Sequence, residues 1–153
     1  MNRKKLDQLV NKGLTVATAE SFTSGAVAAS ITTTPGASRY FVGGIVAYSN
    51  KIKTSVLGVS DNVIALNGVV SENVALEMAR GAQKVLGSDC AIATTGVAGP
   101  DGGTDETPVG TVCLAVVGPE FEEVWTSTLN GSREEVVRKS IKEVLERFIF
   151  LLD

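Results

Sequence analysis

Three polar, glycine-rich segments contain the side chains of this sequence that could carry out chemistry. They span residues 18–25, 48–53 and 94–110. Two of them follow predicted strands, and ligand sites in open α/β sheets gather at the carboxyl ends of strands. The sequence contains no histidine, which excludes Ser-His-Asp and Cys-His triads and any histidine metal site built by this chain alone. A hydrolase built on these segments would need another base.

The first segment, TAESFTSG, places Ser21 where a predicted strand turns into a helix. A hydroxyl there can project from the sheet edge beside unpaired backbone N–H groups, so Ser21 could be a nucleophile or help to hold an anion. It could instead be a helix N-cap, a role shared with Thr23 and Ser24, and spacing alone favours the cap. Residues 14–59 contain one acid, Glu20, and three bases. This local positive charge favours an anionic substrate such as a phosphate ester.

The second segment, AYSNKIK, offers two lysines, Lys51 and Lys53, as partners for the serine. A lysine can act as a general base only when burial or nearby cations lower its pKa towards neutrality. Otherwise the two lysines are a solvated pair on a short helix. Tyr48 could stack on a ligand ring or bond a ligand, or it could simply pack at the end of a strand.

The third segment, TTGVAGPDGGTDETPVGT, is a glycine-rich loop. Its glycines permit positive φ angles and close backbone approach, so it could cradle a substrate or be a flexible crossover. It has neither the Walker pattern nor the GxGxxG dinucleotide pattern. Asp101, Asp105 and Glu106 lack the spacing of an EF-hand loop, and no metal site is expected.

The elements that must position these segments are short helices and strands in mixed order. Apolar runs rich in Val and Thr predict strands over residues 14–20, 43–49, 89–96, 109–118 and 121–129. Helices are expected before Gly13, from the Ser/Thr-rich turn to just before Pro35, over residues 50–59 and 71–87, and from about 132 to 152. About five strands and four or five helices predict one layered α-β-α domain with a mixed sheet over residues 1–153.

The length, the net charge and the composition of the chain limit which kind of protein it can be. The chain has 153 residues, which suits one domain, and its net charge of −3 argues against nucleic-acid binding. No apolar run approaches the ~20 residues of a membrane span, and the basic start lacks the apolar region of a signal peptide. Cys90 and Cys113 lie in apolar runs and are expected to be buried free thiols in a reducing compartment. A soluble, cytoplasmic protein with no membrane or nucleic-acid partner is expected.

Taken in order, five motifs resemble the CinA C-terminal domain family. They are TAESFTSG, AYSNKIKTSVLGV, GVVSENVALEMARGA, TGVAGPDGGTDETPVGTV and NGSREEVVR. The resemblance runs from about Thr15 to Arg138, and the AGPDGGT…PVGTV block is its most specific part. The family includes bacterial amidases that convert nicotinamide mononucleotide to nicotinate mononucleotide and ammonia. In some bacteria the domain follows a second domain, and the length of this chain resembles the stand-alone form.

This resemblance implies an amidase with a serine nucleophile, Ser21, and a lysine base, Lys53, and it alone chooses Lys53 over Lys51. It implies no metal or organic cofactor, a pyridine nucleotide as substrate and a homodimer or higher homo-oligomer. Backbone N–H groups near Ser21 or Gly96 would stabilise the oxyanion, and Arg133 would contact the phosphate. The expected substrate-binding residues are Glu20, Thr23, Ser24, Gly25, Tyr48, Thr95, Gly96, Gly99 and Arg133.

The chain departs from the family pattern at two motifs. Phe22 and Ser24 stand where members usually have cysteine and glycine (TAESCTGG). Ser132 stands where aspartate is common, and the arginine that follows is displaced to Arg138. These changes leave the pair of Ser21 and Lys53 intact. They also suggest an alternative, that the chain is a nucleotide-binding or regulatory member of the family with weakened catalysis.

Overall fold

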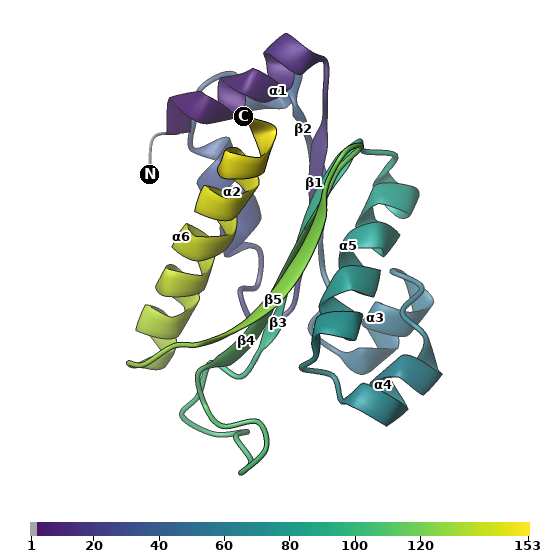
Figure 1. Cartoon of the computed structure of the whole chain (residues 1–153), viewed down its shortest axis with the longest axis vertical. Coiled ribbons are helices and arrows are strands. Elements are labelled where there is room, and N and C mark those ends of the chain that lie inside the picture. Colours follow the sequence, from purple (N-terminus) through teal and green to yellow (C-terminus); the bar gives the residue numbers. More distant parts are fainter. Residues whose placement is uncertain (1–2) are drawn as a thin grey trace.

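A mixed five-stranded sheet lies between two layers of helices in the computed structural model, which describes residues 3–153 (Figure 1). The strand order is β2-β1-β3-β4-β5. Strands β1 (Val16–Glu20), β2 (Phe41–Val46) and β3 (Cys90–Gly96) are parallel, whereas β4 (Thr111–Val117) and β5 (Glu122–Thr128) add antiparallel pairs. The predicted layered α/β fold with a mixed sheet is confirmed.

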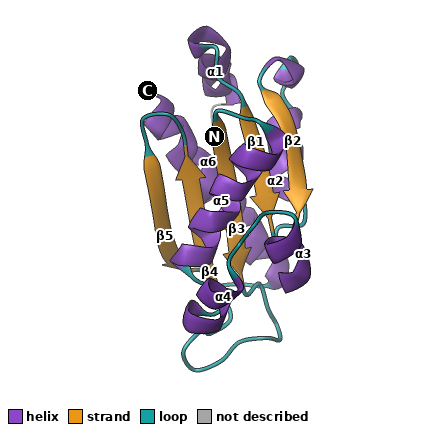
Figure 2. Ribbon diagram, turned by 90° about the vertical axis from the view of Figure 1, so that its right-hand side faces the viewer, coloured by secondary structure: helices purple, strands orange, loops and turns teal. Residues whose placement is uncertain are grey.

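The helices divide between the two faces of the sheet (Figures 1 and 2). One face is covered by α1 (Asp7–Lys12), α2 (Ala26–Thr32) and α6 (Arg133–Leu152), with the 3-10 turns η1 (Arg3–Leu6) and η2 (Ala37–Arg39) at the start of the chain and before β2. The other face is covered by α3 (Asn50–Ser55), α4 (Asp61–Asn67) and α5 (Glu72–Leu86). Each face has its own buried apolar cluster. None of the helices in residues 3–153 is long and apolar enough to cross a membrane.

Small side chains allow α5 to lie close against the sheet. The strand residues buried beneath it include Ala17, Ala19 and Ala93. On its other side, a Cβ on Gly81 would lie 2.0 Å from the carbonyl oxygen of Leu57, so only glycine permits this approach. Leu57 lies two residues beyond the end of α3, so the close approach at Gly81 lets α5 pack against the segment that leads out of the helix carrying Lys53.

Capping residues explain where several elements begin and end. Ser71 and Ser132 accept hydrogen bonds from the N–H groups of Val74 and Glu135, which starts α5 and α6 where the sequence predicted. Gly87 ends α5 in the left-handed conformation.

Several predicted element bounds differ from the structure, and one helix was not predicted. Strand β2 ends at Val46, short of residue 49, because Ser49 caps α3 by accepting the N–H of Ile52. Helix α3 is shorter than the predicted 50–59 segment and ends at Ser55. Helix α4 was not predicted, since none of its seven residues is fully buried and Leu66 is 84% exposed.

Candidate active site

A hollow of about 270 Å³ opens at the carboxyl ends of the parallel strands. It is lined by residues 21–22, 48, 50, 53, 69–70, 95–99 and 101–102, and by Arg133. The glycine-rich loop hangs below this end of the sheet in Figure 2. A larger hollow, about 760 Å³, lies between β5 and α6, where carboxylates, Arg147 and apolar side chains form its wall and no candidate nucleophile is present. The smaller hollow is therefore the candidate site.

Ser21 and Lys53 meet inside this hollow. The Nζ of Lys53 donates a hydrogen bond to the Oγ of Ser21 at 3.0 Å. It also donates to the carbonyl oxygens of Ala47 at 2.9 Å and Tyr48 at 3.5 Å. The lysine is only 1% exposed and the serine 8% exposed. All three partners of the ammonium are neutral, and no ion pair of Lys53 exists among the described side chains.

Burial of Lys53 disfavours its charged form and lowers its pKa below the ordinary value of 10.5. No neighbouring carboxylate opposes this effect. Lys51 lies on the same helix but is exposed. The structure therefore shows which of the two lysines contacts Ser21, a choice that the spacing of the residues alone could not make.

The turn that carries Ser21 is held by a buried carboxylate. Glu20 accepts hydrogen bonds from the N–H groups of Val27 at 2.8 Å and Ala28 at 3.0 Å and from the hydroxyl of Thr23 at 2.7 Å. Those N–H groups belong to the first turn of α2, where no helical partner exists. Glu20 is 1% exposed and acts here as the cap of α2, whose N-cap position, Gly25, offers no side chain.

Four of the predicted substrate-binding residues lie in this turn and do not line the hollow: Glu20, Thr23, Ser24 and Gly25. The Thr23 hydroxyl bonds both Glu20 and the hydroxyl of Thr94, and Ser24 takes a positive φ of 53°. The N-cap role that spacing favoured for Ser21, shared with Thr23 and Ser24, was wrong, because the carboxylate of Glu20 reaches the helix N–H groups instead. In this structure these four residues form the turn around Ser21, and neighbouring residues line the hollow.

Tyr48, Gly99 and Arg133 meet across the mouth of the hollow. Arg133 donates from one guanidinium nitrogen to the carbonyl oxygen of Gly99 at 2.8 Å and from another to the hydroxyl of Tyr48 at 3.0 Å. Tyr48 is 58% exposed, so it extends from the end of β2 into solvent. The exposed guanidinium of Arg133 thereby links three segments that are distant in the sequence.

Thr95 and Gly96 form the inner wall at the end of β3. The Thr95 hydroxyl donates to the carbonyl oxygen of Val69 at 3.0 Å. A Cβ on Gly96 would lie 2.8 Å from a methyl group of Val112 and 3.0 Å from the ring of Phe22. Glycine is therefore required there, and Phe22, which departs from the family pattern, packs against it with only 6% exposure.

The hollow contains further residues that the sequence did not assign to it. Asn50, Val69, Val70 and Asp101 line it. Asp101 was weighed only as a metal ligand, and the two valines lie in the GVVSEN motif, to which no role was given. Arg138 does not line the hollow.

The two thiols are separate from this chemistry. Cys90 and Cys113 are buried and free, as expected. Burial raises the pKa of Cys90 to about 12 and also raises the pKa of Cys113, so both remain protonated at neutral pH. Within residues 3–153 no three His, Cys, Asp or Glu side chains gather as a set of metal ligands.

Comparison with known proteins identifies the family of this chain. The family model of the CinA C-terminal domain matches residues 1–152. CinA-like proteins of Geotalea uraniireducens and Mycobacterium marinum are 51% and 46% identical over 81% and 89% of the chain. The chain spans only 30% and 33% of the lengths of those two relatives.

Solved structures agree over the whole fold. A CinA superfamily protein from Enterobacter cloacae has a TM-score of 0.95 at 33% identity, covering 99% of this chain and 90% of that one. The competence/damage inducible protein CihA from Agrobacterium tumefaciens has a TM-score of 0.88 at 34% identity, covering 99% of this chain and 95% of its own. The chain belongs to the CinA C-terminal domain family.

Proposed function

We propose that the protein is an amidase that hydrolyses the carboxamide of nicotinamide mononucleotide to nicotinate mononucleotide and ammonia. The observation that carries this proposal is the buried contact between Lys53 and Ser21, 3.0 Å long and without a carboxylate partner. An amine in that position can activate a hydroxyl nucleophile without histidine. Residues 1–153 would act as one amidase domain in the cytoplasm.

Loss of one proton prepares Lys53 to act as the base. A neutral amine keeps two N–H groups and one lone pair. The two N–H groups can stay on the carbonyl oxygens of Ala47 and Tyr48, which leaves the lone pair facing Ser21. The serine hydroxyl then becomes the donor and gives its proton to Nζ as Oγ attacks the carboxamide carbon.

The tetrahedral intermediate needs a donor for its negative oxygen. The N–H of Ser21 is committed to the carbonyl oxygen of Thr94 at 3.0 Å, so it is not free for this role. The N–H of Phe22, next in the chain, donates to no group within the described residues, and we assign the oxyanion to it. Collapse of the intermediate breaks the C–N bond, and protonated Lys53 gives its proton to the departing ammonia. Water then attacks the acyl-serine, and nicotinate mononucleotide leaves.

Arg133 would bind the substrate phosphate at the mouth of the hollow. Its guanidinium carries the exposed positive charge nearest to Tyr48 and Gly99, and guanidinium groups bind phosphate through two parallel hydrogen bonds. No metal or organic cofactor takes part in any of these steps.

Ammonia release from nicotinamide mononucleotide tests the proposal directly, with other pyridine nucleotides and plain nicotinamide as comparison substrates. We expect release from the mononucleotide and a loss of release in Ser21→Ala. Binding of the mononucleotide by calorimetry without ammonia release would instead favour a regulatory, nucleotide-binding member of the family. In that case Phe22→Cys and Ser24→Gly, which restore the residues usual in the family, would be the first substitutions to make. Phe22 packs against Gly96, and Ser24 has a positive φ.

A further inference from the structure

Asp101 contributes an unpaired carboxylate to the candidate site. It lines the hollow together with Gly99, Gly102 and Arg133. Within residues 3–153 its side chain makes no hydrogen bond and no ion pair. An aspartate in a Pro-Asp-Gly turn commonly bonds the backbone of its own turn, but Asp101 does not. Formation of the turn therefore does not account for this carboxylate.

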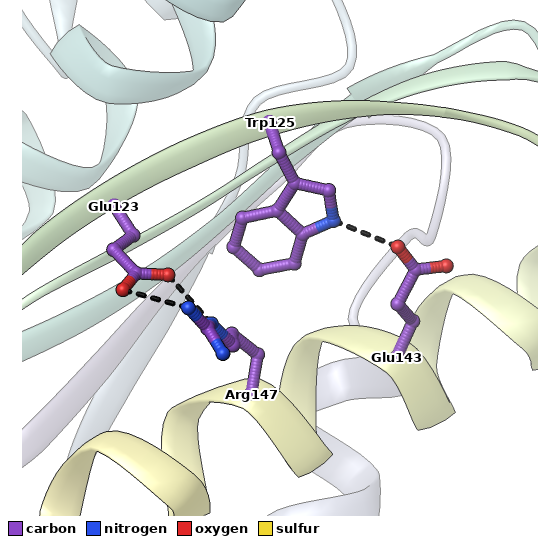
Figure 3. A network of polar contacts seen from close by, with 4 residues as sticks. All are labelled: Glu123, Trp125, Glu143 and Arg147. Carbon is purple, nitrogen blue, oxygen red and sulfur yellow. Dashed lines mark hydrogen bonds and ion pairs between the residues drawn. The ribbon is translucent and has the colours of Figure 1, made fainter.

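The carboxylates of the larger hollow, by contrast, are used inside the protein. Both oxygens of Glu123 accept hydrogen bonds from Arg147, and Glu143 accepts the indole N–H of Trp125 at 2.7 Å (Figure 3). These bonds connect β5 to α6 and need no ligand. Of these three carboxylates, only that of Asp101 is left available to a ligand.

The turn that carries Asp101 is held in place by packing against Val109. A Cβ on Gly99 would overlap the side chain of Val109, and a Cβ on Gly103 would lie 2.7 Å from the backbone nitrogen of the same residue. The two glycines, one on each side of Asp101, thus allow the chain to close tightly around Val109. This part of the loop is packed, and it fixes the backbone from which the carboxylate extends.

Asp101 lies close in the chain to the expected phosphate contact. The carbonyl oxygen of Gly99, two residues before Asp101, accepts a hydrogen bond from Arg133 at 2.8 Å. Arg133 and Asp101 are not among the ion pairs of the described residues. The two opposite charges therefore stay apart at the same site, and each can meet a different group of one ligand.

The chemistry of a mononucleotide supplies a group for each charge. The phosphate would bind Arg133, and a carboxylate would repel it. The ribose, which is joined to the phosphate, carries two adjacent hydroxyl groups, and the two oxygens of a carboxylate can accept a hydrogen bond from each. An acidic side chain binds the ribose hydroxyl in the same way in dinucleotide-binding folds.

We propose that Asp101 binds the 2′- and 3′-hydroxyl groups of the substrate ribose and makes the site selective for ribonucleotides over deoxyribonucleotides. The inference rests on the proposed function, because it takes nicotinamide mononucleotide as the ligand. The positive pyridinium ring is the other group of this ligand that a carboxylate attracts. We favour the ribose because Asp101 follows the residue that holds Arg133, and the ribose is the group bonded to the phosphate.

Calorimetric titration of nicotinamide mononucleotide tests the role of the carboxylate. The titrated protein carries Ser21→Ala, so that the ligand is not consumed. Adding Asp101→Ala should raise Kd by about 10–100-fold, the loss expected when hydrogen bonds to a charged group are removed. Asp101→Asn keeps one acceptor and should have a smaller effect. Asp105→Ala is the matched control, because Asp105 is exposed in the same loop and does not line the hollow, and it should leave Kd unchanged.

Two altered ligands identify the group that Asp101 contacts. The 2′,3′-dideoxy analogue of nicotinamide mononucleotide should bind about 10–100-fold more weakly than the parent ligand, and Asp101→Ala should weaken it little further. Reduced nicotinamide mononucleotide keeps the ribose and the phosphate but has an uncharged ring, and Asp101→Ala should weaken its binding as much as that of the oxidised form. An effect confined to the oxidised form would show that Asp101 attracts the ring charge and would overturn the proposal. An equal loss for the parent ligand and the dideoxy analogue would overturn it too.

Ammonia release from the wild-type protein separates this inference from the proposed function. Binding that depends on Asp101 and on the hydroxyl groups, without ammonia release, would leave the ribose contact standing and exclude the amidase. Ammonia release with the same Kd and KM in Asp101→Ala would leave the amidase standing and overturn the ribose contact. No binding of the mononucleotide at all would overturn both. Circular dichroism and thermal unfolding establish that each variant is folded.

Discussion

The Nζ of Lys53 lies 3.0 Å from the Oγ of Ser21, although 32 residues separate them in sequence. The contact depends on two independent supports. The carboxylate of Glu20 fixes the turn that carries the serine, and the close approach of Gly81 to Leu57 places the helix that carries the lysine. Because every hydrogen-bond partner of the amine is neutral, its surroundings favour the uncharged state that a base requires.

Removal of the amine should abolish most of the catalysis. We expect Lys53→Met to lower kcat for ammonia release by about 10²–10⁴-fold, the range typical of a positioned general base. Ser21→Ala should lower it at least as much, and the double variant little further, because the two residues act as a unit. Lys51→Met is the matched control, since Lys51 is exposed on the same helix, and its kcat should stay at the wild-type value. Full activity in both single variants of the dyad would exclude the proposed mechanism.

The reaction rate should depend on pH through Lys53. The base must be neutral, and burial lowers the pKa of Lys53 below 10.5. The kcat/KM value should therefore rise with pH and level off at a pH below this ordinary lysine pKa. Lys53→Arg should remove the rising limb along with the activity, since a guanidinium stays protonated. A profile that is flat from pH 6 to pH 10 in the active wild type would contradict the assignment.

The same lowered pKa should appear in the stability of the fold. Between the folded-state pKa of Lys53 and its ordinary value of 10.5, the unfolded chain binds more protons than the folded chain. The free energy of unfolding therefore rises with pH across this window, by about 1.4 kcal/mol for each pKa unit of lowering. Urea denaturation of the wild type and of Lys53→Met should show a stability difference that shifts in favour of the wild type as pH rises. A difference that is constant with pH would mean that the lysine titrates alike in both states.

Periodicity and capping signals were sufficient to predict most of the fold. The strands are short and apolar, and Ser71, Gly87 and Ser132 mark helix ends through local hydrogen bonds. Helix α4 escaped prediction because only Val63 and Ile64 turn towards the core, and both are half-buried. Its formation depends on tertiary context that no local pattern records.

The candidate site was predictable as a set of segments but not as a set of side chains. Which lysine faces Ser21 is decided by burial, and the resemblance to relatives, not the spacing, had chosen Lys53. The role of Glu20 as a helix cap depends on its position at the buried end of β1 beside α2. A carboxylate before a serine gives no such indication in sequence, so it was assigned to substrate.

Loss of the Glu20 carboxylate should destabilise the fold. Glu20→Ala leaves the N–H groups of Val27 and Ala28 and the hydroxyl of Thr23 without their buried acceptor. We expect the free energy of unfolding to fall by about 3 kcal/mol, because unmade buried hydrogen bonds cost about 1–3 kcal/mol each and do not add fully. Glu106→Ala, in the exposed loop, is the control and should change stability by less than about 0.5 kcal/mol. A loss as small as the control's would mean that water replaces the carboxylate.

Arg133 should govern affinity for the phosphate and leave the chemical step alone. Charge-assisted hydrogen bonds are worth about 1.5–3 kcal/mol, so Arg133→Ala should raise KM for nicotinamide mononucleotide by about 10–100-fold with little change in kcat. Nicotinamide riboside lacks the phosphate, and the substitution should leave its KM unchanged. Arg138→Ala is the matched control, because Arg138 is exposed on the same helix and does not line the hollow. Tyr48→Phe removes only the hydroxyl that accepts from Arg133 and should have a smaller effect on KM. An equal rise in KM for both substrates in Arg133→Ala would show that the arginine supports the loop through Gly99 and does not contact the phosphate.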